Sequence, residues 1–343
     1  MREIYPWQQE IWGRLSGLRT RLPHALLLKG AQGVGKFDLA MNFAQSVLCE
    51  QPLENGMACD NCPSCHWFQQ ESHPDFRLVQ PDALAAANEE LAGESGKKPA
   101  RQITVDQVRA LAGFSNLTSH RGGYRVVVIC PAESMNVNAA NALLKTLEEP
   151  PGQMLFILVS HKPQHLLPTI LSRCHTLPAS MPSVQASVAW LKQQDIDDPA
   201  GLLAEAGFAP LLARQLADET GASEEHELVL QALMRPEQMD EFALAEELKN
   251  RRVEPVKVIQ WLQQWCYDLA SEKFIHQVRY NIKLHDSISK ISLSIAEFDL
   301  LQLLKDLSVA KREAFHPLEP RLLFEALFAS YRQILRSGNG RSV

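Results

Sequence analysis

The sequence predicts an α/β domain with a parallel sheet, followed by an all-helical region. Within the first 176 residues, short apolar segments alternate with helical patterns, and a glycine-rich turn joins the first of these segments to a helix. This alternation is typical of parallel sheets whose strands are connected by helices. Beyond about Pro178 the strand pattern ends, and amphipathic helical patterns continue toward the C-terminus.

The expected elements follow one another along the first domain. A strand at 24–29 leads through the glycine-rich turn into a helix at 37–48. The segment 124–129 reads Tyr-Arg-Val-Val-Val-Ile and is apolar enough for a strand buried on both faces. A helix with apolar residues at Ala140, Leu143, Leu144 and Leu147 ends at two prolines. The other expected elements are strands at 76–80 and 155–159 and helices at 104–117 and 164–172.

Composition limits the class of protein. Apolar residues make up 45% of the 343 residues and charged residues 22%, which is ordinary for a folded protein and excludes a wholly disordered chain. No apolar run approaches the roughly 18 residues of a membrane span, and the N-terminus lacks a signal-peptide core, so we expect a cytoplasmic protein without membrane contact. The 34 basic and 40 acidic residues give a net charge of −6, so any contact with DNA must be local or shared with partners.

Four of the seven cysteines lie in one short segment, namely Cys49, Cys59, Cys62 and Cys65. In a reducing cytosol, clustered cysteines are more often metal ligands than disulfides. Four thiolates would close a tetrahedral zinc site and leave no open position for a substrate, so the zinc would be structural. Two alternatives are that these are unpaired surface thiols, or that His66 replaces one of the four ligands.

The glycine-rich turn has the spacing of a phosphate-binding loop. Gly30 and Gly35 flank four residues that include Gly33, and Lys36 follows. Backbone N–H groups of such a loop surround phosphate oxygens, and the lysine adds a point charge. The sequence therefore predicts a phosphate-loop fold.

The sequence around this loop lacks the residues that would coordinate magnesium and activate the attacking water. Phe37 occupies the position where a serine or threonine hydroxyl would coordinate Mg²⁺. The strand at 124–129 ends in Cys130-Pro131 instead of an acidic residue, and Glu133 comes several residues late for a general base. We therefore expect no ATP hydrolysis by this chain, and nucleotide binding by the loop is doubtful.

Two motifs resemble those of a known family. The segment Asn141-Ala142-Leu143-Leu144-Lys145-Thr146-Leu147-Glu148-Glu149-Pro150-Pro151 and the segment Thr169-Ile170-Leu171-Ser172-Arg173-Cys174 are similar to the bacterial clamp-loader family of AAA+ proteins, as is the four-cysteine module. The resemblance implies a RecA-like AAA+ domain at 1–176 with a zinc module at 49–65, a helical lid at 177–222 and a helical collar at 223–343. Pro210 stands where the lid of ATP-hydrolysing members carries an arginine.

The resemblance also assigns a role to Arg173. In this family, an arginine at this position reaches the phosphates bound by the neighbouring subunit and acts as an arginine finger in trans. Its planar fork can bond two phosphate oxygens at once. The alternative is that Arg173 caps a helix or forms an ion pair with Glu148 or Glu149.

Taken together, the resemblance implies a non-hydrolysing clamp-loader subunit of DNA polymerase III. Such a subunit is a rigid stator in a five-subunit ring with gamma/tau and delta subunits, which loads the sliding clamp on primer-template DNA. One alternative is an ATP-hydrolysing motor of the gamma/tau type. Another is a zinc finger that reads DNA, but Glu50, Glu54, Asp60 and Glu71 make the cysteine segment acidic.

Overall fold

The computed structural model describes residues 4–88, 100–115, 123–150, 152–218, 224–314 and 319–339. The chain divides into two compact units, Met1–Ala186 and Ser187–Val343. The first unit holds every strand of the described residues, and the second is helical. None of the described helices has the length and apolar character needed to cross a bilayer.

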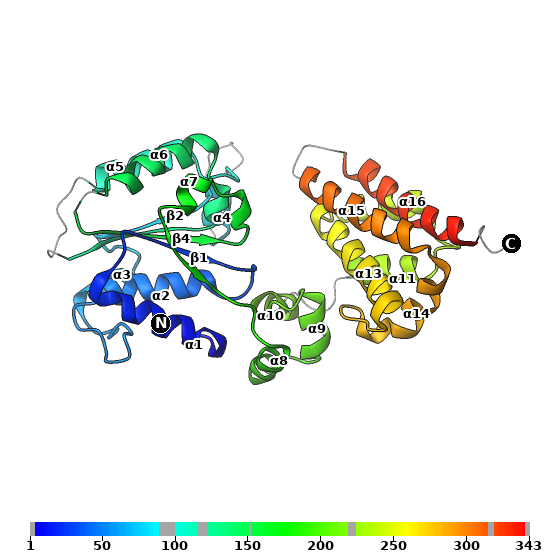
Figure 1. The fold of residues 1–343 in the computed structure, drawn as a ribbon, viewed down its shortest axis with the longest axis horizontal. Coiled ribbons are helices and arrows are strands. Elements are labelled where there is room, and N and C mark those ends of the chain that lie inside the picture. Colours follow the sequence, from blue (N-terminus) through cyan, green and yellow to red (C-terminus); the bar gives the residue numbers. More distant parts are fainter. Residues whose placement is uncertain are drawn as a thin grey trace. The chain divides into compact units, whose positions relative to one another are not determined.

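The first unit is built on a parallel sheet (Figure 1). Its strand order is β2-β3-β4-β1-β5, and all four neighbouring pairs are parallel. The inner strands β3 and β4 are buried along their whole length, which explains their unbroken apolar sequences. Each strand expected from the sequence is present within one or two residues. The bounds are Ala25–Lys29 (β1), Phe76–Val79 (β2), Arg125–Ile129 (β3), Met154–Ser160 (β4) and His175–Pro178 (β5).

Helices cover both faces of this sheet (Figure 1). Because side chains alternate along a strand, Leu26 and Leu28 pack with one set of helices, while Leu27 packs with the other. The first face carries α1 (Gln9–Gly17), α2 (Lys36–Leu48) and α3 (Pro63–Gln69). The second carries α5 (Val105–Ser115), α6 (Val137–Glu148) and α7 (Pro168–Leu171). A further short helix, α4, spans Asp82–Asn88; residues 116–117 of the helix expected at 104–117 lie outside the described residues.

The helices from residue 224 onward share one apolar core around α13 (Pro255–Ile275). Apolar residues on α13, including Leu262, Trp265 and Leu269, are fully buried among the surrounding helices. The Trp265 indole N–H donates to the Tyr331 hydroxyl (2.9 Å), which donates to the Leu233 carbonyl (3.0 Å), so one buried chain of hydrogen bonds joins three helices. The helices from the division onward are α8 (Val184–Gln193), α9 (Pro199–Glu205), α10 (Pro210–Asp218), α11 (Glu224–Met234), α12 (Glu241–Asn250), α13 (Pro255–Ile275), α14 (His285–Ser294), α15 (Glu297–Glu313) and α16 (Pro320–Asn339).

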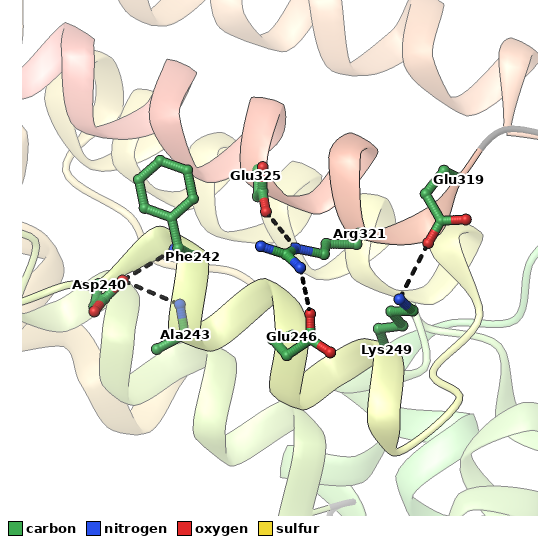
Figure 2. Close-up of polar contacts among 8 residues, drawn as sticks. All are labelled: Asp240, Phe242, Ala243, Glu246, Lys249, Glu319, Arg321 and Glu325. Carbon is green, nitrogen blue, oxygen red and sulfur yellow. Dashed lines mark hydrogen bonds and ion pairs between the residues drawn. The ribbon is translucent and has the colours of Figure 1, made fainter.

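Ion pairs lie where α12 meets α16 and the residue before it, at the surface of this unit, and one of them, Arg321 with Glu246, joins the two helices (Figure 2). Arg321 contacts Glu246 at 2.9 Å and Glu325 at 2.7 Å, and Lys249 lies 3.4 Å from Glu319. These side chains are about half exposed or less, and isolated surface pairs contribute only about 0.2–1 kcal/mol each. The buried apolar side chains therefore hold the unit together, and the ion pairs add little.

Candidate functional site

The phosphate loop leaves the carboxyl end of β1 and enters α2, as the sequence predicts. Gly33 and Gly35 have φ angles of 77° and 80°, a left-handed backbone that favours glycine. A Cβ atom on Gly30 would lie 2.2 Å from the carbonyl oxygen of Ala179, so this glycine permits close contact with the chain beyond β5. The three glycines therefore shape the loop through backbone geometry.

Lys36 is folded back into the loop. Its side chain is 2% exposed, and its ammonium group donates to the carbonyl oxygens of Gly30 (2.9 Å) and Ala31 (2.5 Å). Burial lowers the pKa of Lys36 to about 8, although the nearby Cys130 and Glu133 partly oppose this shift. The charge that would meet a phosphate group is thus hydrogen-bonded to the loop itself.

The N-terminal segment covers the same loop. The side-chain amide of Gln8 donates to the carbonyl oxygens of Val34 (2.9 Å) and Gly35 (2.8 Å), and the Trp7 indole donates to Val34 (3.1 Å). The Tyr5 hydroxyl donates to Asp38 in the first turn of α2 (3.1 Å). Sequence reasoning missed these contacts, because one glutamine and two aromatic residues give no local pattern that points to a loop some 26 residues away.

Glu133 is held at the end of the sheet by backbone groups. One carboxylate oxygen accepts hydrogen bonds from the N–H groups of His161 (2.9 Å) and Lys162 (3.1 Å) beyond β4. Its other oxygen and the Nδ1 atom of His161 are buried without a hydrogen-bond partner in the part of the chain that the structure describes. The carboxylate lies within electrostatic reach of Lys36 and joins the turn after β3 to the turn after β4.

The four clustered cysteines converge on one point. Their sulfur atoms all lie within 4.8 Å of one another, and the Cys49 and Cys62 sulfurs are 3.9 Å apart. Zn–S bonds of 2.3 Å in a regular tetrahedron would separate the sulfurs by about 3.8 Å, so the group fits a zinc ion. His66 is exposed and lies outside this group. The structure therefore brings together the four residues that the sequence predicts and gives no support to the histidine alternative.

Backbone and side-chain contacts position these thiols. The N–H of Cys59 donates to the Cys49 sulfur (3.2 Å), and that of Cys65 donates to the Cys62 sulfur (3.4 Å). Burial raises the pKa of Cys65, so this group would stay a neutral thiol unless a cation compensated its charge. The Ser64 hydroxyl donates to the Leu48 carbonyl at the end of α2 (2.6 Å), which fastens the cluster to the first domain.

Arg173 lies just beyond α7 and forms an ion pair within its own chain. Its Nη2 atom is 2.7 Å from Glu148 Oε1, and its Nη1 atom donates to the carbonyl oxygen of Thr169 (3.0 Å). The side chain remains 34% exposed. Of the ion pairs that the sequence leaves open, the structure contains the pair with Glu148.

Comparisons with known proteins identify the family. The profile described as "DNA polymerase III, delta subunit" matches residues 12–182. DNA polymerase III subunit delta' of Pseudomonas aeruginosa is 39% identical over 282 residues, which span 80% of each chain. The chain belongs to the DNA polymerase III delta' family. Subunit delta' of Bacillus subtilis is 35% identical over 59% of this chain and 52% of its own length, and that of Escherichia coli is 34% identical over 58% and 56%.

The region matched by the family profile contains most of the site residues described above, although Tyr5, Trp7 and Gln8 precede it. The profile spans the phosphate loop, the cysteine cluster and Arg173, and the Pseudomonas aeruginosa match extends to most of the chain. Whole-chain likeness to solved structures is weak. A gamma subunit-related protein of Thermotoga maritima has a TM-score of 0.47 at 17% identity over 96% of this chain and 100% of its own, and the Bacillus subtilis clamp loader delta protein has 0.33 at 12% over 94% and 99%.

Proposed function

We propose that this chain is a clamp-loader subunit of DNA polymerase III that does not hydrolyse ATP and instead supplies Arg173 to a neighbouring ATP-hydrolysing subunit. Its partners are gamma/tau and delta subunits in a five-subunit ring, and the ring loads the sliding clamp on primer-template DNA. Its relatives, which are delta' subunits of DNA polymerase III, support the assignment to that polymerase. The division of labour within the ring is argued from the residues.

The observation on which the proposal rests is the engagement of Lys36 by the carbonyl groups of its own loop. Phosphate binding by Lys36 would require these hydrogen bonds to break. Phe37 would still provide no hydroxyl for a magnesium ion. An ATP-hydrolysing motor of the gamma/tau type needs both a lysine that contacts the phosphates and a hydroxyl that binds the magnesium ion. The geometry therefore favours a chain that leaves ATP hydrolysis to its neighbour.

Arg173 suits the role that remains. It lies just beyond the short helix α7 and is partly exposed, so a neighbouring molecule can reach it. A guanidinium group placed against a transferring phosphoryl group stabilises the charge that develops there, which is worth roughly 10³–10⁵-fold in rate in measured systems. The chain thereby acts on a reaction whose metal and water are held elsewhere.

The cysteine cluster and the helical region complete the proposal. Cys49, Cys59, Cys62 and Cys65 would hold one structural zinc ion, which brings α2 and α3 together and leaves no coordination position for chemistry. The helical lid at 177–222 and the collar at 223–343 would join the chain to the ring and make it a rigid stator.

The test is ATP turnover by the reconstituted complex. Replacing wild-type chain by Arg173→Ala should leave assembly intact, as judged by gel filtration, and should slow the DNA-stimulated turnover because one site loses its finger. Arg173→Lys should restore little of the rate, since an ammonium group cannot bond two phosphate oxygens in a fork. An unchanged rate for Arg173→Ala would refute the finger role.

A further inference from the structure

We propose that Glu148 is a positioning residue for Arg173, whose carboxylate holds the guanidinium group ready for the neighbouring subunit's phosphates. This inference rests on the proposed function and adds a second residue to it. Glu148 is the last residue of α6, and Arg173 lies 25 positions later, beyond α7. The contact therefore joins the end of α6 to the turn after α7, and β4 lies between these two elements in the sequence.

The geometry fixes both terminal nitrogens of Arg173. Glu148 Oε1 accepts from Nη2 at 2.7 Å, which is the length of a strong charge-assisted hydrogen bond, and the Thr169 carbonyl accepts from Nη1 at 3.0 Å. Because the guanidinium group is planar, two contacts on different nitrogens define the orientation of the whole fork. A flexible side chain is thus held in one orientation before any partner binds.

The acceptor is itself held in place by the core. Leu147 and Ile170, each close in sequence to one partner of the ion pair, are fully buried in the same apolar cluster between α6, α7 and the sheet. Movement of α6 relative to α7 would disturb this packing. The packed ends of α6 and α7 therefore hold the chain next to Glu148 and the turn that carries Arg173 close together.

The contact leaves donors for a ligand. A guanidinium group has five N–H groups, and the contacts to Glu148, Thr169 and the Ser172 hydroxyl (3.4 Å) use three of them. The remaining two have no partner in the described residues, and the side chain is 34% exposed. Phosphate oxygens could bind these two N–H groups while Glu148 keeps its own contact.

The experiment measures DNA-stimulated ATP turnover by the reconstituted complex containing Glu148→Gln, a variant that keeps the shape and removes the charge. Because the pair is partly exposed, we expect a loss of about 2–5-fold, smaller than the loss caused by Arg173→Ala. The matched control is Glu149→Gln, the adjacent exposed carboxylate, which has no ion pair in the described part of the chain and should turn over at the parental rate. In the Arg173→Ala background, Glu148→Gln should slow turnover no further, because its effect passes through the arginine.

The possible outcomes separate this inference from the proposed function. If Arg173→Ala slows turnover but Glu148→Gln does not, the positioning role is wrong and the finger stands. Faster ATP turnover with Glu148→Gln would also overturn the positioning role, because it would mean that the carboxylate holds Arg173 away from the phosphates. A loss that persists in the Arg173→Ala background would show that Glu148 acts only on the structure of α6, and no effect of Arg173→Ala would refute both proposals.

Discussion

At the scale of single residues, the main feature of the molecule is Lys36, whose ammonium group is bound by carbonyl groups of its own loop. A buried ammonium group is unfavourable unless oxygen atoms replace its water, and the carbonyls of Gly30 and Ala31 provide part of this replacement, while burial still lowers the pKa of Lys36 to about 8. We therefore propose that Lys36, which the spacing of the loop marks as a phosphate ligand, is a structural residue of the loop in this chain. The same contacts make its removal measurable as a loss of stability.

The substitution Lys36→Ala should destabilise the first unit. It removes the packing of the buried aliphatic stem and leaves the partly buried carbonyls of Gly30 and Ala31 without their donor, which together cost about 1–3 kcal/mol in free energy of unfolding. Urea unfolding of the chain measures this loss, with Lys145→Ala on the exposed side of α6 as control. Equal stability of Lys36→Ala and the parent would show that the ammonium contacts contribute nothing to the fold.

His161 gives the first unit a dependence on pH. Burial, followed by the nearby Lys36 charge, lowers the pKa of His161 to about 4, against about 6.5 in an unfolded chain. Between these values the unfolded chain binds a proton that the folded chain does not, so this group reduces stability as the pH falls from about 6.5 to about 4. The variant His161→Gln cannot bind that proton, and its free energy of unfolding should rise relative to the parent over this range.

Urea unfolding at several pH values between 7 and 4 tests this expectation. The exposed His165, changed to glutamine, is the matched control and should follow the parent. A difference between His161→Gln and the parent that stays constant with pH would contradict the account.

At the scale of elements, much of the first unit could be predicted from the sequence. Apolar runs such as 124–129 leave no alternative to a buried strand, and the cysteine spacing brings Cys62 and Cys65 to the start of one helix. The hydrogen bonds that Tyr5, Trp7 and Gln8 donate to the phosphate loop and the start of α2 could not be predicted. These contacts join segments distant in sequence through single side chains. Local patterns therefore predict the elements and the cluster, whereas the hydrogen bonds from the N-terminal segment to the loop are seen only in the structure.

The cysteine cluster should couple metal binding to the stability of the first unit. Cys62→Ser or Cys65→Ser removes one thiolate from the tetrahedral group and should release zinc and lower the melting temperature, since folding is linked to metal binding. Atomic absorption and thermal unfolding measure the two effects. Cys174→Ser, which changes a cysteine outside the cluster, should keep the parental zinc content. Unaltered zinc content in the cluster variants would refute the site.

At the scale of the whole molecule, the sequence predicts where strands end but not how the later helices pack. Amphipathic patterns show that α13 buries one face, yet they do not say which helices cover it. Tyr331, Trp265 and Leu233 join three helices through hydrogen bonds that span up to 98 positions, and no local pattern encodes such a contact. The division at residues 186 and 187 lies within α8, so the boundary between the expected first domain and the lid at 176 and 177 remains a prediction.

The central claim assigns different roles to two cations of one chain, with Lys36 structural and Arg173 acting on a neighbour. The most direct test compares DNA-stimulated ATP turnover of complexes reconstituted with Lys36→Ala or with Arg173→Ala, at a temperature where both variants are folded. The account predicts that the Lys36→Ala complex keeps the parental rate and that the Arg173→Ala complex is slowed. Loss of turnover in the Lys36→Ala complex, together with a parental rate for Arg173→Ala, would contradict it.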